Sequence, residues 1–138
     1  MNQTVLTFGY PDTVLREFDH WVVMLRPEQI TVGTLVLVAK SEAASLGALT
    51  REEWAEFANV SSYAENLLRS VFGAEKFNYL ALMMKDPNVH FHLVPRYSGT
   101  VAIGGEHFTD SDWPLKTELK PLEISHATYQ TIKAELLQ

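Results

Sequence analysis

One long stretch with helical periodicity, residues 51–72, most constrains how this chain can fold. It begins at a capping box, Thr50-Arg51-Glu52-Glu53, in which the Thr50 side chain accepts from the Glu53 N–H while Glu53 reaches back to the Thr50 N–H. Gly73 follows the stretch and is suited to end a helix. Apolar residues recur between these ends at close to helical spacing: Trp54, Phe57, Ala58, Val60, Ala64, Leu67, Leu68, Val71 and Phe72. The sequence predicts a long amphipathic helix, which must bury its apolar face against another element.

Four strand-like runs flank this helix, two before it and two after it. They are WVVML (21–25), TLVLVA (34–39), FNYLALMM (77–84) and residues 89–97. Arg26-Pro27 and Gly33 interrupt the first pair, and Lys85-Asp86-Pro87-Asn88 has the composition of a tight turn, so each pair predicts a hairpin. The order hairpin, helix, hairpin favours an α+β fold, with an antiparallel meander sheet of about five strands and the helix packed on it.

Residues 98–138 carry weaker signals. They predict a turn at Gly104-Gly105, a short edge strand at 106–109 and a loop at 110–122. A final helix is predicted after Ser125, which can cap it. The final helix would turn Tyr129, Ile132 and Leu136 inward. The chain has 138 residues, no internal repeat and no linker-like tract, so we expect a single domain, 1–138.

Composition excludes several classes of function. The net charge of −6, with histidine neutral, leaves no basic surface for a nucleic-acid backbone. The chain has no cysteine, which excludes disulfides, thiolate catalysis and thiolate metal sites. It begins without the basic and apolar regions of a signal peptide, and no apolar run is long enough to span a membrane. We therefore expect a cytoplasmic protein with neither nucleic acid nor membrane as a partner.

The run of residues with the most unusual chemistry is the last predicted strand, NVHFHLVPRY (88–97). Side chains on a strand alternate between its two faces. Asn88, His90, His92 and Arg96 should therefore share one face, while the residues on the opposite face are apolar. One face belongs to the core, and the other carries two imidazoles, an amide and a guanidinium.

Three interpretations fit this polar face. The histidines can be ordinary half-buried polar residues. Alternatively, His-x-His can hold one metal ion, provided that a third ligand such as Glu106 or His107 folds back to it. In the third interpretation, one neutral imidazole attacks a phosphoryl group and the second donates a hydrogen bond to its oxygens. A hydrogen bond to the other nitrogen of the nucleophile would fix its tautomer.

The segment from His90 to Arg96, HFHLVPR, resembles the signature of the histidine triad superfamily, His-φ-His-φ-His-φ-φ followed by Pro-Arg. In this alignment Asn88 takes the place of the first histidine, and His90 and His92 match the second and third. The resemblance, to a histidine triad protein of bacterial type, extends over about residues 15–97 and leaves 98–138 as a C-terminal extension.

The resemblance implies a histidine triad fold and a nucleoside phosphate hydrolase or transferase. Its substrate would be a dinucleoside polyphosphate or a nucleotide phosphoramidate, cleaved through a nucleotidyl-histidine intermediate. His90 would be the nucleophile and His92 the phosphate donor, with Asn88 supporting the site and Asn78 and Arg96 contacting substrate. The resemblance further implies no metal in the site, with Mg²⁺ entering only as a complex with some substrates, and a homodimer.

Three departures from the family pattern bear on substrate and activity. Asn88 replaces a histidine, Leu25 stands where many members carry an acid or amide for the ribose hydroxyls, and Lys85-Asp86-Pro87 replaces a glycine-rich segment. They leave base specificity and the leaving-group acid open. They also keep a second hypothesis open, a nucleotide-binding module that has lost turnover.

Overall fold

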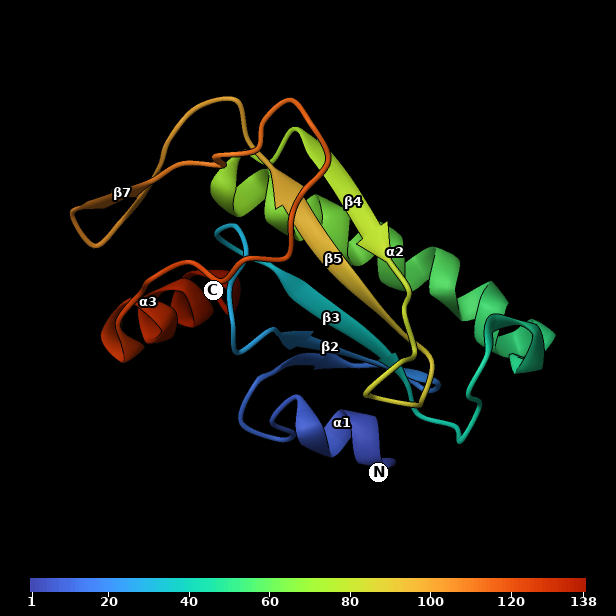
Figure 1. Ribbon diagram of the computed structural model, residues 1–138. Helices are drawn as coiled ribbons and strands as arrows, with labels where there is room; N and C mark the ends of the chain where they lie inside the picture. Colours follow the sequence, from blue (N-terminus) through green and yellow to red (C-terminus); the bar gives the residue numbers. More distant parts are fainter.

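The computed structural model describes residues 1–138 and contains a five-stranded antiparallel sheet (Figure 1). Its strands are β1 (Val14–Glu17), β2 (Trp21–Leu25), β3 (Leu35–Ala39), β4 (Lys76–Leu80) and β5 (His90–Arg96). The predicted α+β class and antiparallel sheet are confirmed. The order β1-β2-β3-β5-β4 is a meander only as far as β3, because the chain crosses to the edge at β4 and then returns as β5.

The crossing is made by the predicted long helix, α2 (Arg51–Phe72). Its capping box is present, with Glu53 N donating to the Thr50 hydroxyl at 3.1 Å and Thr50 N donating to the Glu53 carboxylate at 3.0 Å. Gly73 ends the helix in the left-handed region at φ 73°. This is a conformation that glycine adopts at little cost. Both ends of the helix are therefore set by local sequence.

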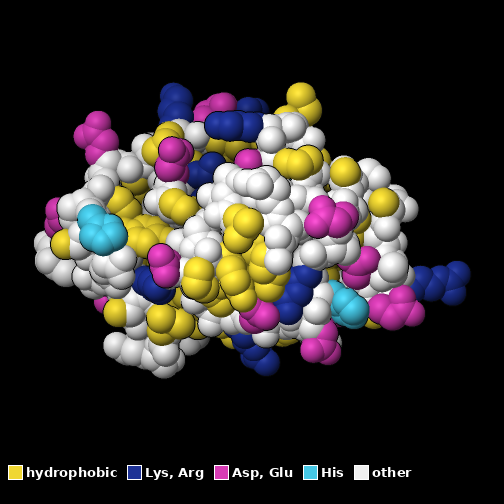
Figure 2. Space-filling view, turned by 90° about the horizontal axis from the view of Figure 1, so that it is seen from below, with side chains coloured by type: hydrophobic (Ala, Val, Ile, Leu, Met, Phe, Trp, Pro, Cys, Tyr) yellow, Lys and Arg dark blue, Asp and Glu magenta, His cyan; other side chains and the backbone are white.

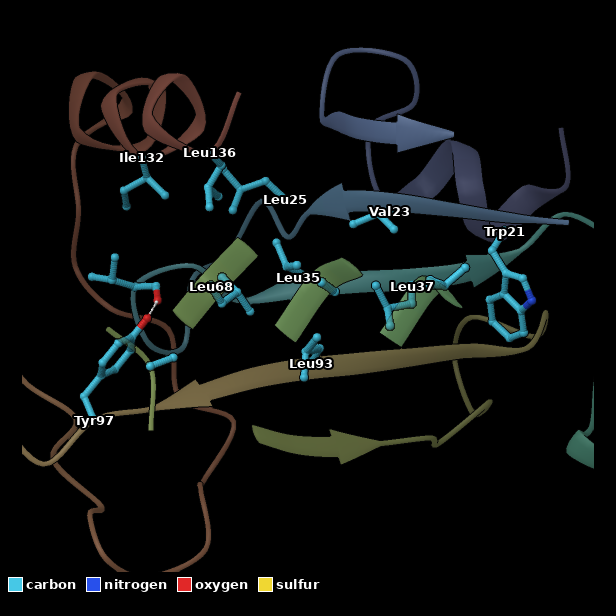
Figure 3. Close-up of a cluster of buried hydrophobic side chains, with 14 of the residues drawn as sticks. Trp21, Val23, Leu25, Leu35, Leu37, Leu68, Leu93, Tyr97, Ile132 and Leu136 are labelled. Carbon is cyan, nitrogen blue, oxygen red and sulfur yellow. Dashed lines mark hydrogen bonds between the residues drawn. The ribbon is translucent and has the colours of Figure 1, made fainter. Parts of the chain in front are cut away.

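α2 and the C-terminal helix α3 (His126–Leu136) cover one face of the sheet and close the main core. Figure 3 shows the side chains that meet there: Trp21, Val23, Leu25, Leu35, Leu37 and Leu93 from the sheet, and Leu68, Ile132 and Leu136 from the helices. Tyr97 closes one end of this core, because its hydroxyl donates to the Val32 carbonyl at 2.6 Å. Ser125 caps α3 as expected.

The opposite face of the sheet is covered by a helix that the sequence did not predict. α1 (Gln3–Thr7) brings Val5 and Phe8 onto a small cluster formed by Val22, Met24, Val36 and Val38. Figure 1 shows α1 at the bottom of the molecule, apart from α2 and α3. A helix of five residues is too short to show a period or to be stable alone. Its position therefore depends on contacts with the sheet.

Three other predictions differ from the structure. β4 ends at Leu80 rather than residue 84, so residues 81–89 form a loop in place of a tight turn. The expected edge strand at 106–109 is β7 (Glu106–Phe108), which pairs with β6 (Val101–Ile103) in a separate two-stranded sheet. A short 3-10 helix, η1 (Leu46–Ala48), was not expected. No helix is both long and apolar enough to cross a membrane.

Candidate active site

The side chains of β5 alternate as the sequence predicts. Leu93 and Phe91 pack toward α2, whereas His90 and His92 face the cluster beneath α1. β5 lies between β3 and β4, with Val36 opposite His92 and Val38 opposite His90 on β3. A strand paired on both sides holds its backbone firmly. The two imidazoles are therefore fixed on a rigid element.

The hydrogen-bond contact of His90 identifies which of its two ring nitrogens is a donor. Its Nδ1 lies 2.7 Å from the backbone oxygen of Asn88. A carbonyl oxygen only accepts hydrogen bonds, so Nδ1 must carry the proton and donate. In the neutral imidazole, Nε2 of His90 is then the nitrogen without a proton, and it has the lone pair that a nucleophile needs.

His92 has the opposite arrangement. Arg26 Nε donates to His92 Nδ1 at 3.2 Å. Because a guanidinium only donates, Nδ1 is the unprotonated nitrogen and the proton of a neutral His92 lies on Nε2. Burial, followed by nearby His90 and Arg26, lowers the pKa of His92 to about 4. At neutral pH, His92 is thus a neutral imidazole with one N–H to donate, and its ring lies edge-on to His90 with 4.9 Å between centroids.

Arg26 is a site residue that sequence reasoning missed. The sequence marks it only as the break after a strand, yet the alternation of Val22 and Met24 on β2 continues to Arg26 and places it on the histidine face. Leu25, the position that the family resemblance assigns to the ribose, faces the other way and is fully buried in the main core. Extending the strand alternation by one residue would have identified Arg26.

Asn88 does not support His90 through its side chain. Its Oδ1 accepts from the Thr4 backbone N–H at 3.2 Å and from the Thr4 hydroxyl at 3.0 Å, and its Nδ2 donates to the Glu42 carboxylate at 3.4 Å. The backbone N–H of Asn88 donates to the Thr4 hydroxyl at 3.0 Å. Only the backbone oxygen of Asn88 reaches His90. Asn88 therefore ties α1 to the start of β5.

The histidines are covered by the N-terminal segment. The Phe8 ring lies 5.5 Å from the ring of His90 and 5.8 Å from that of His92, and the two histidines are only 2% and 5% exposed. Asn2 anchors the start of α1 by donating to the carbonyls of Ala39 and Ser41. Figure 2 shows this side of the molecule, with hydrophobic side chains gathered near its centre.

The two predicted substrate-binding residues are brought together, but away from the histidines. Arg96 forms a two-pronged salt bridge with Asp110, at 2.6 and 3.1 Å, and donates to Asn78 Oδ1 at 2.7 Å. Arg96 lies four residues beyond His92 on β5, about 13 Å along the strand. Both side chains of the salt bridge are buried. A substrate that contacted Arg96 would therefore meet a guanidinium already paired with Asp110 and Asn78.

The third ligand needed by the metal interpretation is not supplied by β7. Glu106 lies in the separate two-stranded sheet, where its carboxylate accepts from the hydroxyl of Thr128 on α3 at 2.7 Å. No three histidine, aspartate or glutamate side chains approach closely enough to hold a metal ion. The condition set by the metal interpretation, that Glu106 or His107 folds back to His90 and His92, is not met in this structure.

Comparison with known proteins finds similarity in structure. No family model and no curated protein sequence matches the chain. A histidine triad protein from Marinobacter aquaeolei superposes with a TM-score of 0.73 and 21% identity, covering 99% of this chain and 91% of that one. A hypothetical histidine triad nucleotide-binding protein from Sulfolobus tokodaii superposes with a TM-score of 0.69 and 14% identity, covering 97% of this chain and 87% of that one. A zinc-bound histidine triad family protein from Mycobacterium smegmatis superposes with a TM-score of 0.64 and 16% identity, covering 96% of this chain and 88% of that one. The chain therefore has the fold of histidine triad proteins, as residues 88–96 led us to expect.

Proposed function

We propose that the protein is a histidine triad enzyme that transfers a nucleotidyl group from a nucleoside phosphate to water through His90. The observation that supports this most is the pair of opposite tautomers on one strand. A neutral His90 offers an unprotonated Nε2, and His92 beside it has an N–H to donate. An attack on phosphorus needs one of each.

The reaction proceeds in two displacements. The lone pair of His90 Nε2 forms a bond to the α-phosphorus, and the bond from phosphorus to the leaving group breaks with its electron pair on the leaving group. Water then attacks the same phosphorus, the phosphorus–nitrogen bond breaks, and the nucleoside monophosphate departs. The proton lost by water passes to solvent. His92 Nε2–H donates to a phosphoryl oxygen, where negative charge develops in both steps.

The substrate class follows from the family resemblance, as a dinucleoside polyphosphate or a nucleotide phosphoramidate. Mg²⁺ would enter bound to the substrate. We further propose a homodimer and a cytoplasmic location, both on the resemblance and composition. A monomeric mass by light scattering at micromolar concentration would contradict the dimer.

Substrate access requires movement of the N-terminal segment. A phosphorus atom must come to about 3–3.5 Å from His90 Nε2 before bond formation, and Phe8 now covers both rings. Thr4 holds α1 to the start of β5 through hydrogen bonds with Asn88, and Asn2 holds it to Ala39 and Ser41, beside the apolar contacts of Val5 and Phe8. Water and substrate can replace polar contacts more readily than they can open an apolar core.

The test is a hydrolysis assay with a panel of dinucleoside polyphosphates and nucleotide phosphoramidates, with and without EDTA. The wild-type protein is compared with His90→Ala and with His107→Ala, a control in the separate two-stranded sheet. Turnover in the wild type and the control, and none in His90→Ala, supports the proposal. Undiminished turnover in His90→Ala would reject it.

A second candidate function is nucleotide binding without turnover. The burial of His90 beneath Phe8 favours it, as does an asparagine in place of the first triad histidine. Saturable binding of a nucleotide by calorimetry, with no product from any substrate in the panel, would support this alternative. A metal-dependent hydrolase is distinguished by stoichiometric metal in the purified protein, together with loss of activity on its removal.

A further inference from the structure

We propose that Arg26 is a positioning residue, which fixes His92 as the Nε2–H tautomer and so directs its only donor to the substrate phosphate. This inference rests on the proposed function for its consequence in catalysis. The tautomer itself is a property of the free protein and can be tested without any substrate.

The guanidinium of Arg26 is held in place from several sides. Its Nη1 donates to the Glu28 carbonyl at 2.7 Å, which leaves Nε directed at His92 Nδ1. The backbone of Arg26 is anchored as well, since its amide donates to the Thr34 carbonyl and its carbonyl accepts from the Gln29 side chain. The side chain is only 16% exposed. The contact with His92 is therefore part of a fixed local structure and does not depend on a free surface side chain.

Arginine suits this role because its protonation does not change. A neutral imidazole has two tautomers, and the partner of one nitrogen decides which of them is present. A lysine or a histidine beside Nδ1 could lose its proton and become an acceptor, whereas a guanidinium stays a donor at every relevant pH. Arg26 thus excludes the tautomer of His92 in which Nε2 would present a lone pair to the phosphate.

The contrast with His90 makes the assignment specific. The partner of His90 Nδ1 is the Asn88 carbonyl, which only accepts, and the partner of His92 Nδ1 is a guanidinium, which only donates. Two imidazoles that lie two residues apart are thereby held as opposite tautomers, Nδ1–H for His90 and Nε2–H for His92. Other charges near Arg26 are the Glu28 carboxylate at 3.9 Å, which is well exposed, and Asp86. Neither carboxylate is recorded in hydrogen-bond contact with His92.

The direct test is nitrogen NMR of the imidazoles in protein labelled with ¹⁵N-histidine, at pH 7 and without ligand. The chemical shifts of Nδ1 and Nε2 report which nitrogen carries the proton. We expect Nε2–H for His92 in the wild type, a mixture of tautomers in Arg26→Met, and a return towards Nε2–H in Arg26→Lys. His90 should stay Nδ1–H throughout. The matched control is Arg51→Met, at an exposed arginine on α2.

The inference is overturned if His92 is Nδ1–H in the wild type, or if its tautomer is unchanged in Arg26→Met. Whether His90 is a nucleophile is decided separately, by turnover in the wild type and its loss in His90→Ala, so the two failures can be told apart. If the panel of nucleotides shows no turnover but the tautomers are as expected, the proposed function fails and the role of Arg26 in setting the tautomer is retained.

Kinetics supply a second readout that a merely structural role would not produce. Loss of one donor to a developing oxyanion lowers kcat by about 10²–10³-fold, and we expect Arg26→Met to lower it by about 10-fold or more. If Arg26 acts through His92, the double variant Arg26→Met/His92→Gln should be no slower than His92→Gln alone. A further 10-fold loss in the double variant would show that Arg26 acts independently of His92, and would overturn the inference.

Discussion

The two faces of the sheet are closed by different kinds of contact. On the α2 face, 19 buried residues form one apolar cluster that draws on the sheet and both long helices (Figure 3). On the α1 face the apolar cluster has six buried residues, and the cover is held by the polar side chains of Asn2, Thr4 and Asn88. β5 contributes to both, with Leu93 on the first face and the two histidines on the second.

The difference separates stability from chemistry along a single strand. Apolar burial contributes roughly 25 cal/mol for each Å² removed from water, so the α2 face supplies most of the folding free energy. The α1 face contains polar groups that have partners in the closed state and that can exchange them for water or a ligand. Replacing a β5 residue on the α2 face should therefore lower stability, and replacing one on the α1 face should lower activity.

The largest expected effect is that of His90→Gln on activity. We expect turnover to fall by about 10⁴-fold or more, because the proposed nucleophile is removed and glutamine has no free nitrogen lone pair to replace it. The glutamine side chain retains polar atoms near the Asn88 carbonyl, so the midpoint of urea unfolding should stay near that of the wild type. Activity assays and denaturation curves on the same preparation measure both. A variant that loses activity only because it is unfolded would contradict the separation of the two faces.

The next largest is that of Leu93→Ala on stability. Leu93 is fully buried against α2, and removing such a side chain costs about 2–5 kcal/mol of the free energy of unfolding. The remaining folded protein should keep its turnover number at low temperature, since His90 and His92 face the other way. Urea unfolding followed by circular dichroism measures the loss. A change below about 1 kcal/mol would show that the α2 face is not the main source of stability.

Asn88→Ala should have a smaller effect that is concentrated in the N-terminal segment. It removes the acceptor of the Thr4 amide and hydroxyl, at a cost of about 1–3 kcal/mol. Amide hydrogen exchange of residues 3–8 should then accelerate more than that of α2. The His90 tautomer should persist, because the backbone carbonyl of residue 88 is still present. Asn59→Ala, on the exposed side of α2, is the control, and equal protection of residues 3–8 in both variants would contradict a tie between α1 and β5.

The smallest expected effect is a pH dependence that comes from His92. Its pKa is lowered to about 4 in the fold, from about 6.5 in the unfolded chain, so the unfolded state binds more protons between these values. The contribution to stability is complete above pH 6.5 and is lost as the pH falls through 4. Allowing for solvent screening, the loss is about 2 kcal/mol. Urea midpoints at pH 7 and pH 4 should differ by less in His92→Gln, and an equal difference in both proteins would exclude this cause.

How much the sequence could predict depends on whether a structure is set locally. The capping box at Thr50, the glycine at residue 73 and the alternation along β5 are local signals, and each is confirmed. α1 and β1 have four or five residues each and are defined by their contacts with the rest of the sheet. Neither segment has the continuous apolar run that marked the equally short strands β2 and β3, so the sequence carries no such signal for them.

The candidate site shows the same limit. His90 and His92 were found from spacing within a strand, but Arg26 reaches His92 across 66 positions in the sequence. The sequence indicated that Asn88 stands in the first triad position. It did not indicate that the side-chain oxygen of Asn88 binds Thr4, because the two residues are 84 positions apart in the sequence. The single-domain assignment and the site roles of Asn78 and Arg96 stay predictions.

The central claim, that His90 is the nucleophile, is tested most directly by trapping the covalent intermediate. A substrate found in the panel is mixed with enzyme, quenched within milliseconds in alkaline denaturant, which spares phosphorus–nitrogen bonds, and analysed by intact mass and peptide mapping. The account predicts a nucleotidyl adduct on the peptide that contains His90, absent from His90→Gln. Turnover that leaves no adduct at any quench time, or an adduct on a different residue, would contradict it.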